Sequence, residues 1–171
     1  MITLTIILPV KHSHNFINFC LESILEQHNE FDELIVIDDK ADNNHIKYIK
    51  RFLSLNLSSN KFKIIKNKNA LHNAGSARDF GINIAKGEYI AFLDDDDIWP
   101  TNYLKFRKNL ISEHNCFFSA SPYSYIDEEF KLIREIRHKK MILNKKDFSL
   151  RNPIANSTVI IKKSLLIQAG G

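Results

Sequence analysis

Short apolar runs recur along the chain up to about residue 100, and each is followed by a segment with helical spacing. The runs over 4–10 and 33–39 are continuous and apolar, which is typical of buried strands, and 61–67 and 88–94 are expected to form a third and a fourth strand. Apolar positions three and four apart predict helices from Ser13 to about His28, from Asn43 or Asn44, within 73–87, and from Pro100 to about Glu113. Gly87 is placed to end the third helix. The inward face of the first helix is expected to comprise Phe16, Phe19, Cys20, Ile24 and Gln27.

After residue 115 the pattern changes to a looser alternation of apolar and polar residues. It predicts a hairpin from 116–127 and 130–137, a basic connector over 138–148, and a strand over 156–164 that leads into a helix. Strands that alternate with helices form parallel sheets covered on both faces. We therefore expect one α/β domain over 1–171, with a mostly parallel central sheet flanked by helices and an added C-terminal hairpin and strand region.

The fourth apolar run ends in four consecutive aspartates, Asp94 to Asp97, within the segment AFLDDDDIWP. At about 5 Å and an effective dielectric near 20, each pair of such charges costs roughly 3 kcal/mol. A hard divalent cation with oxygen ligands, Mg²⁺ or Mn²⁺, offsets this repulsion. Such ions usually take one or two protein carboxylates and complete their shell with phosphate oxygens. The alternative is plain surface acidity. The acidic segment therefore favours a metal bound together with a phosphorylated ligand, and Trp99 is expected to pack behind it.

A second acidic pair, Asp38 and Asp39, ends the second apolar run. Parallel strands point their carboxyl ends to one edge of a sheet, where ligands gather. We expect the two acidic clusters at neighbouring strand tips of that edge, where a carboxylate accepts hydrogen bonds from a nucleobase or a ribose. Capping of the following helix is the alternative for this pair.

Arg78 is the third candidate, because it lies in the first turn of the helix after Gly75. A guanidinium there binds the base or phosphates of a nucleotide, and a solvated arginine on the helix face is the alternative. The glycine turn is not a Walker loop, because no Gly-Lys-Ser/Thr follows. His12 and His14 have ligand chemistry but no third ligand nearby.

Composition sets the class of partner and the compartment. The chain of 171 residues has a net charge of +4, and no basic run is interleaved with aromatic residues, which argues against nucleic acid. The basic excess fits anionic ligands or an anionic membrane face. Cys20 and Cys116 lack CxxC spacing and fit reduced thiols. Without a signal peptide or an apolar run of membrane-spanning length, we expect a cytoplasmic protein, either soluble or peripheral at the inner face of the cytoplasmic membrane.

Several ordered motifs resemble family 2 glycosyltransferases, which have the A-type, Rossmann-like nucleotide-diphospho-sugar transferase fold. They are TIILPV, ESILEQ, DELIVIDDKAD and NAGSARDFGINIAKGEYIAFLDDDDIWP, over about 3–113. A weaker likeness, NPIANSTVIIKKSLLIQAGG, covers 152–171.

The resemblance implies a role for each matching residue. Pro9 and Lys11 line the nucleobase site, Asp39 meets the base with Asp38 beside it, and Arg78 lies near the nucleotide. Asp94, Asp95 and Asp96 fall on the DXD motif. There Asp96 binds the metal, and its neighbours approach the ribose or sugar.

The implied activity is metal-dependent transfer of a sugar from a nucleotide-diphospho-sugar to a saccharide or lipid-linked saccharide acceptor, usually with inversion. This reaction builds polysaccharide or lipopolysaccharide, and its cofactor is Mn²⁺ or Mg²⁺. Lys11 and His12 depart from the family, which has an aromatic residue and asparagine there.

The resemblance places the catalytic base beyond Gly171, so no catalytic residue is assigned. It implies a nucleotide-sugar-binding half over 1–114 and an incomplete acceptor-side half over 115–171. The alternative is an inactive nucleotide-sugar-binding fragment or subunit. A phosphoacceptor domain or a haloacid dehalogenase-like phosphatase lacks support, because the residues expected after its aspartates are missing.

Overall fold

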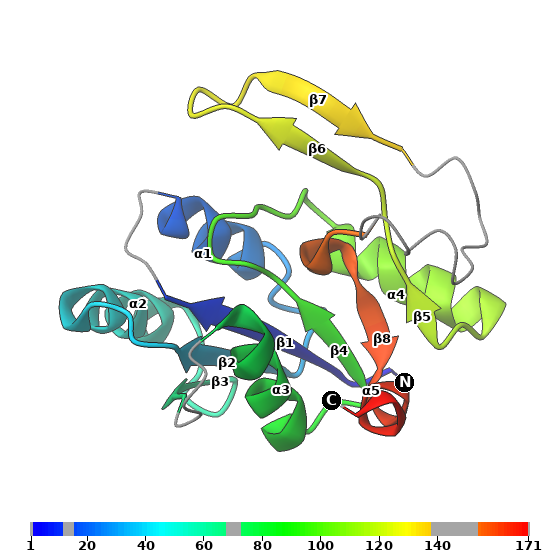
Figure 1. The fold of residues 1–171 in the computed structure, drawn as a ribbon, viewed down its shortest axis with the longest axis horizontal. Helices are drawn as coiled ribbons and strands as arrows, with labels where there is room; N and C mark the ends of the chain where they lie inside the picture. Colours follow the sequence, from blue (N-terminus) through cyan, green and yellow to red (C-terminus); the bar gives the residue numbers. More distant parts are fainter. Residues whose placement is uncertain (1, 12–15, 68–72, 138–153, 171) are drawn as a thin grey trace.

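A six-stranded mixed sheet forms the centre of the computed structural model, which describes residues 2–11, 16–67, 73–137 and 154–170 (Figure 1). In spatial order the strands are β3 (Phe62–Lys66), β2 (Glu33–Asp38), β1 (Leu4–Val10), β4 (Tyr89–Phe92), β8 (Ile160–Lys162) and β5 (Phe118–Ser119). The first four strands in this order are parallel, and β8 runs antiparallel to both of its neighbours. The predicted α/β class with a mostly parallel sheet is confirmed.

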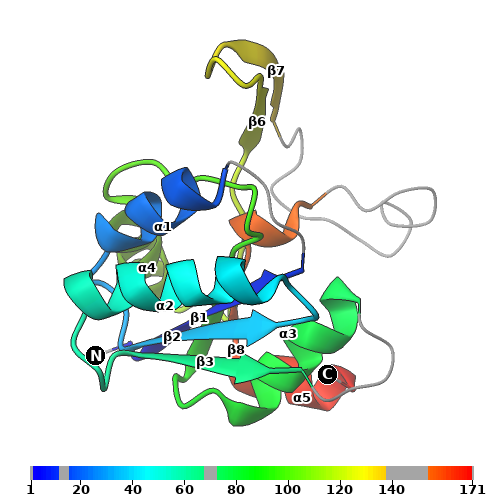
Figure 2. The same ribbon diagram turned by 90° about the vertical axis from the view of Figure 1, so that its left-hand side faces the viewer.

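Helices cover both faces of this sheet (Figure 2). On one face lie α1 (Ile17–Leu25), α2 (Asn43–Asn56) and α4 (Tyr103–His114). On the other lie α3 (Ala74–Ile84) and α5 (Lys163–Ala169). A 3₁₀ turn, η2 (Asn156–Thr158), precedes β8.

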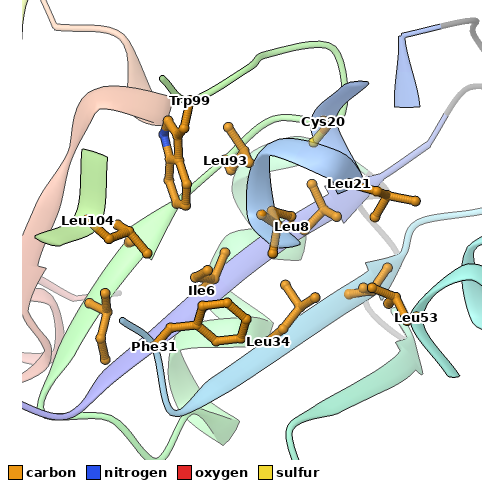
Figure 3. Close-up of a cluster of buried hydrophobic side chains, with 14 of the residues drawn as sticks. Ile6, Leu8, Cys20, Leu21, Phe31, Leu34, Leu53, Leu93, Trp99 and Leu104 are labelled. Carbon is orange, nitrogen blue, oxygen red and sulfur yellow. The ribbon is translucent and has the colours of Figure 1, made fainter. Parts of the chain in front are cut away.

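Two apolar clusters explain why β1 reads as an unbroken apolar run. Ile6 and Leu8 point into the larger cluster beneath α1, α2 and α4 (Figure 3), whereas Ile7 points into the cluster on the opposite face. All three side chains are fully buried. A strand that is covered on both faces needs apolar residues at every position, because neither face meets water.

The first helix differs from its prediction in length and in its buried face. It spans Ile17–Leu25 and so ends before His28, while the predicted start at Ser13 lies outside the described residues. Phe19 is 40% exposed rather than inward. Its ring meets the ring of Phe130 edge-on, with centroids 4.7 Å apart. This distant partner explains why helical spacing alone misplaced Phe19.

The C-terminal region forms a hairpin, but with different strand bounds. The predicted strand 116–127 is divided: β5 joins the main sheet through β8, and β6 (Tyr123–Ile126) pairs with β7 (Leu132–Ile136) in a separate two-stranded sheet. Pro122, which lacks a backbone N–H, lies at the break. Figures 1 and 2 show this hairpin projecting away from the central sheet.

The segment before and after β8 also differs from its prediction. The predicted strand 156–164 is instead the turn η2, the short strand β8 and the first residues of α5. The predicted basic connector, 138–148, lies outside the described residues.

Gly87 does not end a helix, because α3 already stops at Ile84. A Cβ on Gly87 would lie 2.5 Å from the backbone nitrogen of Thr5, so this position needs glycine for close approach of two backbones. Within the described part of the chain, no helix combines the length and the apolar character that a membrane crossing requires.

Candidate functional site

The two acidic strand ends lie at the same edge of the sheet. Both β2 and β4 pair in parallel with β1, so Asp38 at the end of β2 and Asp94 just after β4 point to one edge. The predicted common edge is confirmed. The prediction of neighbouring strand tips is wrong, because β1 runs between them and separates the tips by about 10 Å. The end of β1 places buried Pro9 and exposed Lys11 between the two acidic groups.

The four aspartates of the turn after β4 have different environments. The carboxylate of Asp94 forms an ion pair with the guanidinium of Arg78. The backbone N–H of Asp97 donates to the carbonyl of Asp94 at 3.1 Å and closes the turn. Asp95 is partly buried. Asp96 is exposed, and no hydrogen bond or ion pair to another described residue engages its side chain. Asp96 is therefore the carboxylate most accessible to a ligand.

A buried layer supports the turn from below. The hydroxyl of Ser157 accepts a hydrogen bond from the backbone N–H of Asp94 at 3.0 Å and donates one to the carboxylate of Asp97. The indole N–H of Trp99, which is 4% exposed, donates to the carbonyl of Ser157 at 2.7 Å. Trp99 thus packs behind the turn, as predicted. Ser157 was not identified from the sequence, since a single serine carries no motif.

Burial and neighbouring negative charges raise the pKa of Asp97 in the turn and of Cys20 on α1. The pKa of Asp97 is raised, chiefly because its carboxylate is desolvated, and Asp96 and Asp94 add to this effect. Hydrogen bonding from Ser157 acts in the opposite direction. Burial, with the nearby aspartates, raises the pKa of the Cys20 thiol well above its ordinary value, so this residue is a neutral packing group. The carboxylates of the turn therefore repel one another, and a bound cation would reduce this repulsion.

The second acidic pair is divided between a buried and an accessible residue. Asp39 is 1% exposed, and its Oδ1 accepts a hydrogen bond from the side-chain amide of Asn67 at 2.8 Å. The same amide lies 3.4 Å from the hydroxyl of Ser76 on α3. Asp38 is partly exposed and accepts from the backbone N–H of Ala41 at 3.0 Å. Asn67, directly after β3, is a further residue that sequence reasoning missed.

Arg78 reaches the site from the start of α3. A capping box between Asn73 and Ser76 fixes the first turn of this helix, and Arg78 follows two residues later. Its side chain is 15% exposed, so the alternative of a solvated arginine is wrong. The Nε group is buried without a hydrogen-bond acceptor among the described residues, while the far end of the guanidinium holds Asp94.

The oxygen ligands at this edge fit a hard divalent cation. Among the described residues, no three His, Cys, Asp or Glu side chains converge on a complete metal site. Mg²⁺ commonly binds through one or two carboxylates plus substrate phosphates, so exposed Asp96 beside Asp95 offers suitable chemistry. His12 and His14 lie outside the described residues.

A family model and several known proteins match most of the chain. The family model described as Glycosyl transferase family 2 matches residues 5–166. The UDP-Glc:alpha-D-GlcNAc-diphosphoundecaprenol beta-1,3-glucosyltransferase WfgD from Escherichia coli is 31% identical over 163 residues, covering 95% of this chain and 61% of that protein.

Solved structures share the fold. S. aureus TarS 1–349 in complex with UDP matches 98% of this chain and 48% of its own, with a TM-score of 0.75 and 20% identity. The mannosyltransferase PcManGT from Pyrobaculum calidifontis, in complex with GDP-Man and Mn²⁺, matches 99% of this chain and 47% of its own, with a TM-score of 0.70 and 16% identity. This chain therefore spans 61% of the E. coli relative and about half of each solved chain.

Proposed function

Because the chain belongs to glycosyl transferase family 2 and has an A-type fold, we propose that it binds a nucleotide-diphospho-sugar donor at the edge formed by β2, β1 and β4. The observation that carries this proposal is the accessible Asp96 on a turn whose other carboxylates are engaged or partly buried, next to the Arg78–Asp94 ion pair. An exposed carboxylate, a buried guanidinium and a second acidic strand end together match a diphosphate flanked by a sugar and a nucleoside.

Each group at the edge takes one part of the donor. Asp38 at the end of β2 is the accessible carboxylate toward the nucleobase or ribose, and the buried Asp39 lies beside it. Pro9 and Lys11 lie along the side of the base. Arg78 lies near the nucleotide, and Asp94 and Asp95 approach the ribose or sugar. The ligand of the metal is Asp96. Lys11 contributes charge where the family has an aromatic ring, so the base is held through polar contacts more than stacking.

Asp96 would hold Mn²⁺ or Mg²⁺, and the bound ion would supply Lewis-acid neutralisation of the nucleoside diphosphate. The chain's own residues orient the donor. The ion pair with Arg78 holds Asp94 in place, and the buried layer under the turn fixes the direction of the aspartates. The Mn²⁺ in the mannosyltransferase structure of the same fold supports this metal role.

The names of two similar proteins support a class of donor and a class of acceptor. The E. coli relative is named for transfer from UDP-Glc to a GlcNAc-diphosphoundecaprenol acceptor, and the S. aureus structure contains UDP. We assign to this chain a uridine diphosphate sugar and a lipid-linked saccharide, used in polysaccharide or lipopolysaccharide synthesis. The reaction then takes place at the inner face of the cytoplasmic membrane.

Calorimetry with UDP, with and without Mn²⁺, tests the proposal. The wild type should bind UDP more tightly with Mn²⁺, and Asp96→Asn should lose this metal-dependent gain while keeping its fold by circular dichroism. Glu113→Gln, which removes an exposed carboxylate from α4, is the matched control. Metal-dependent binding by Asp96→Asn equal to that of the wild type would overturn the metal assignment.

Hydrolysis of UDP-glucose and UDP-N-acetylglucosamine then separates enzyme from binding module. Release of UDP from either donor supports a transferase. Tight binding of UDP with no turnover of either donor would favour a nucleotide-sugar-binding fragment instead.

A further inference from the structure

We propose that Ser157 is a positioning residue for the turn Asp94 to Asp97 after β4, here called the aspartate turn. Its hydroxyl fixes the geometry in which this turn binds a divalent cation. The inference rests on the proposed metal role of Asp96. It assigns a function to a residue in the C-terminal part of the chain, far in sequence from the turn that it supports.

The hydroxyl of Ser157 makes two contacts that lie at opposite ends of the turn. As an acceptor, its oxygen holds the backbone N–H of Asp94, at 3.0 Å, and as a donor it holds the carboxylate of Asp97. Asp96, the proposed ligand, lies between these two anchored residues. One hydroxyl therefore fixes the backbone at Asp94, before Asp96, and the carboxylate of Asp97, after it.

The position of Ser157 is itself fixed. The residue is 6% exposed in the turn η2, and its carbonyl accepts the indole N–H of Trp99 at 2.7 Å. The backbone N–H of Trp99 lies 3.3 Å from the hydroxyl of Ser23 on α1. Trp99 thus ties Ser157 to the packed interior, so the hydroxyl points at the turn from a rigid base.

This anchoring affects metal binding because the aspartates repel one another. Without the hydroxyl, the carboxylate of Asp97 is free to turn away from its neighbours, and the turn relaxes to an arrangement that spreads its charges. A cation then has to restore the bound geometry, which lowers its affinity. Removing groups that orient metal ligands typically lowers metal affinity by about 10–100-fold.

Thr158 provides a matched comparison within the same turn. It is also 6% exposed, and its hydroxyl donates to the carbonyl of Ala155 at 2.7 Å, inside η2 itself. Deleting this hydroxyl removes a buried hydrogen bond of similar length without touching the aspartates. Ser157→Ala and Thr158→Val therefore each delete one hydroxyl from η2, but only Ser157→Ala removes a contact to the aspartate turn.

The experiment measures the affinity of Mn²⁺ by calorimetry in the presence of saturating UDP, and the affinity of UDP without metal. We expect Ser157→Ala to weaken Mn²⁺ binding by about tenfold or more and to leave metal-free UDP binding within about twofold. Thr158→Val should bind Mn²⁺ like the wild type, and Ser157→Thr, which keeps a hydroxyl, should recover most of the loss. Thermal melting of each variant checks that it is folded.

The outcomes separate this inference from the proposed function. If the wild type shows no Mn²⁺-dependent UDP binding, the metal role of the turn fails first. If the wild type binds Mn²⁺ but Ser157→Ala binds it equally well, or Thr158→Val loses as much affinity, Ser157 has no specific positioning role. If Ser157→Ala does not fold, Ser157→Gly, which also lacks the hydroxyl, replaces it, and unchanged Mn²⁺ affinity in that variant would equally overturn the inference.

Discussion

The guanidinium of Arg78 forms an ion pair with the carboxylate of Asp94, and this contact joins the start of α3 to the turn after β4. The two side chains are 15% and 32% exposed, so the pair is largely shielded from solvent. It brings two residues that were selected independently from the sequence into one site. A donor diphosphate at this edge would meet the positive charge of Arg78, which the ion pair holds close to the acidic turn.

Replacing Arg78 with alanine should weaken UDP binding by about tenfold, because the guanidinium provides the main positive charge beside the turn. Arg78→Lys should recover part of the affinity, since a lysine keeps the charge but lacks the planar group with several donors. Arg51→Ala, an exposed change on α2, serves as the control. Calorimetry measures each variant, and unchanged affinity in Arg78→Ala would exclude contact with the nucleotide.

Replacing Asn67 with alanine should lower both stability and UDP affinity. The change removes a hydrogen-bond donor from the buried carboxylate of Asp39, which costs about 1–3 kcal/mol. For a chain of this size, that is a fall in Tm of roughly 2–12 °C. The exposed Asn83→Ala on α3 is the control. In a double-mutant cycle, Asp39→Ala should make the Asn67 change less harmful, and strict additivity would contradict a direct coupling.

Asp97→Asn should stabilise the metal-free protein at neutral pH, because the raised pKa shows that the ionised carboxylate is unfavourable in the folded state. Folded Asp97 binds its proton more tightly than the unfolded chain does, so wild-type stability falls as pH rises from 3.8 through the folded-state pKa. The gain in Tm should be no more than about 2–4 °C, because Asp97 is an exposed residue whose carboxylate is only partly desolvated.

The pH dependence of this gain is the sharper test. Thermal melts from about pH 3 to pH 8 should show the two proteins converging below the ordinary Asp value, where both states are protonated. A difference in Tm that stays constant across the range would show that ionisation of Asp97 is not its cause.

Gly87→Ala should destabilise the fold strongly. The new methyl group would lie 2.5 Å from the backbone nitrogen of Thr5, and backbone cannot move aside as a side chain does. A cost of about 1–3 kcal/mol or more corresponds to a Tm lower by roughly 2–12 °C. Gly81→Ala meets a side-chain atom of Ile7 at 2.7 Å and should be milder. The reverse order of melting temperatures would contradict this account.

The sheet was predictable because its parallel strands are local apolar runs. β1 and β2 are buried on both faces, so nearly every position is apolar. Such strands can be recognised without knowing which strands they pair with. The short edge strands were harder. Whether Phe118 pairs within a hairpin or with β8 depends on residues some forty positions later, which no local pattern records.

The candidate site divides in the same way. Arg78 and Asp94 are charged residues in or next to recognisable motifs, so they could be identified as candidates from the sequence. Ser157 and Asn67 are neutral, common residues whose importance lies in what they contact across the fold. Such supporting groups become visible only when distant segments are placed side by side.

The place of β8 between β4 and β5 also sets an order of assembly. During synthesis, β5 emerges well before the strand that bonds it to the sheet, and the turn after β4 emerges well before Ser157. Contacts between remote segments form late, because the intervening chain must first be closed into a loop. We expect β1 to β4 to form an early core, with the edge of the sheet and the aspartate turn completed together in one final step.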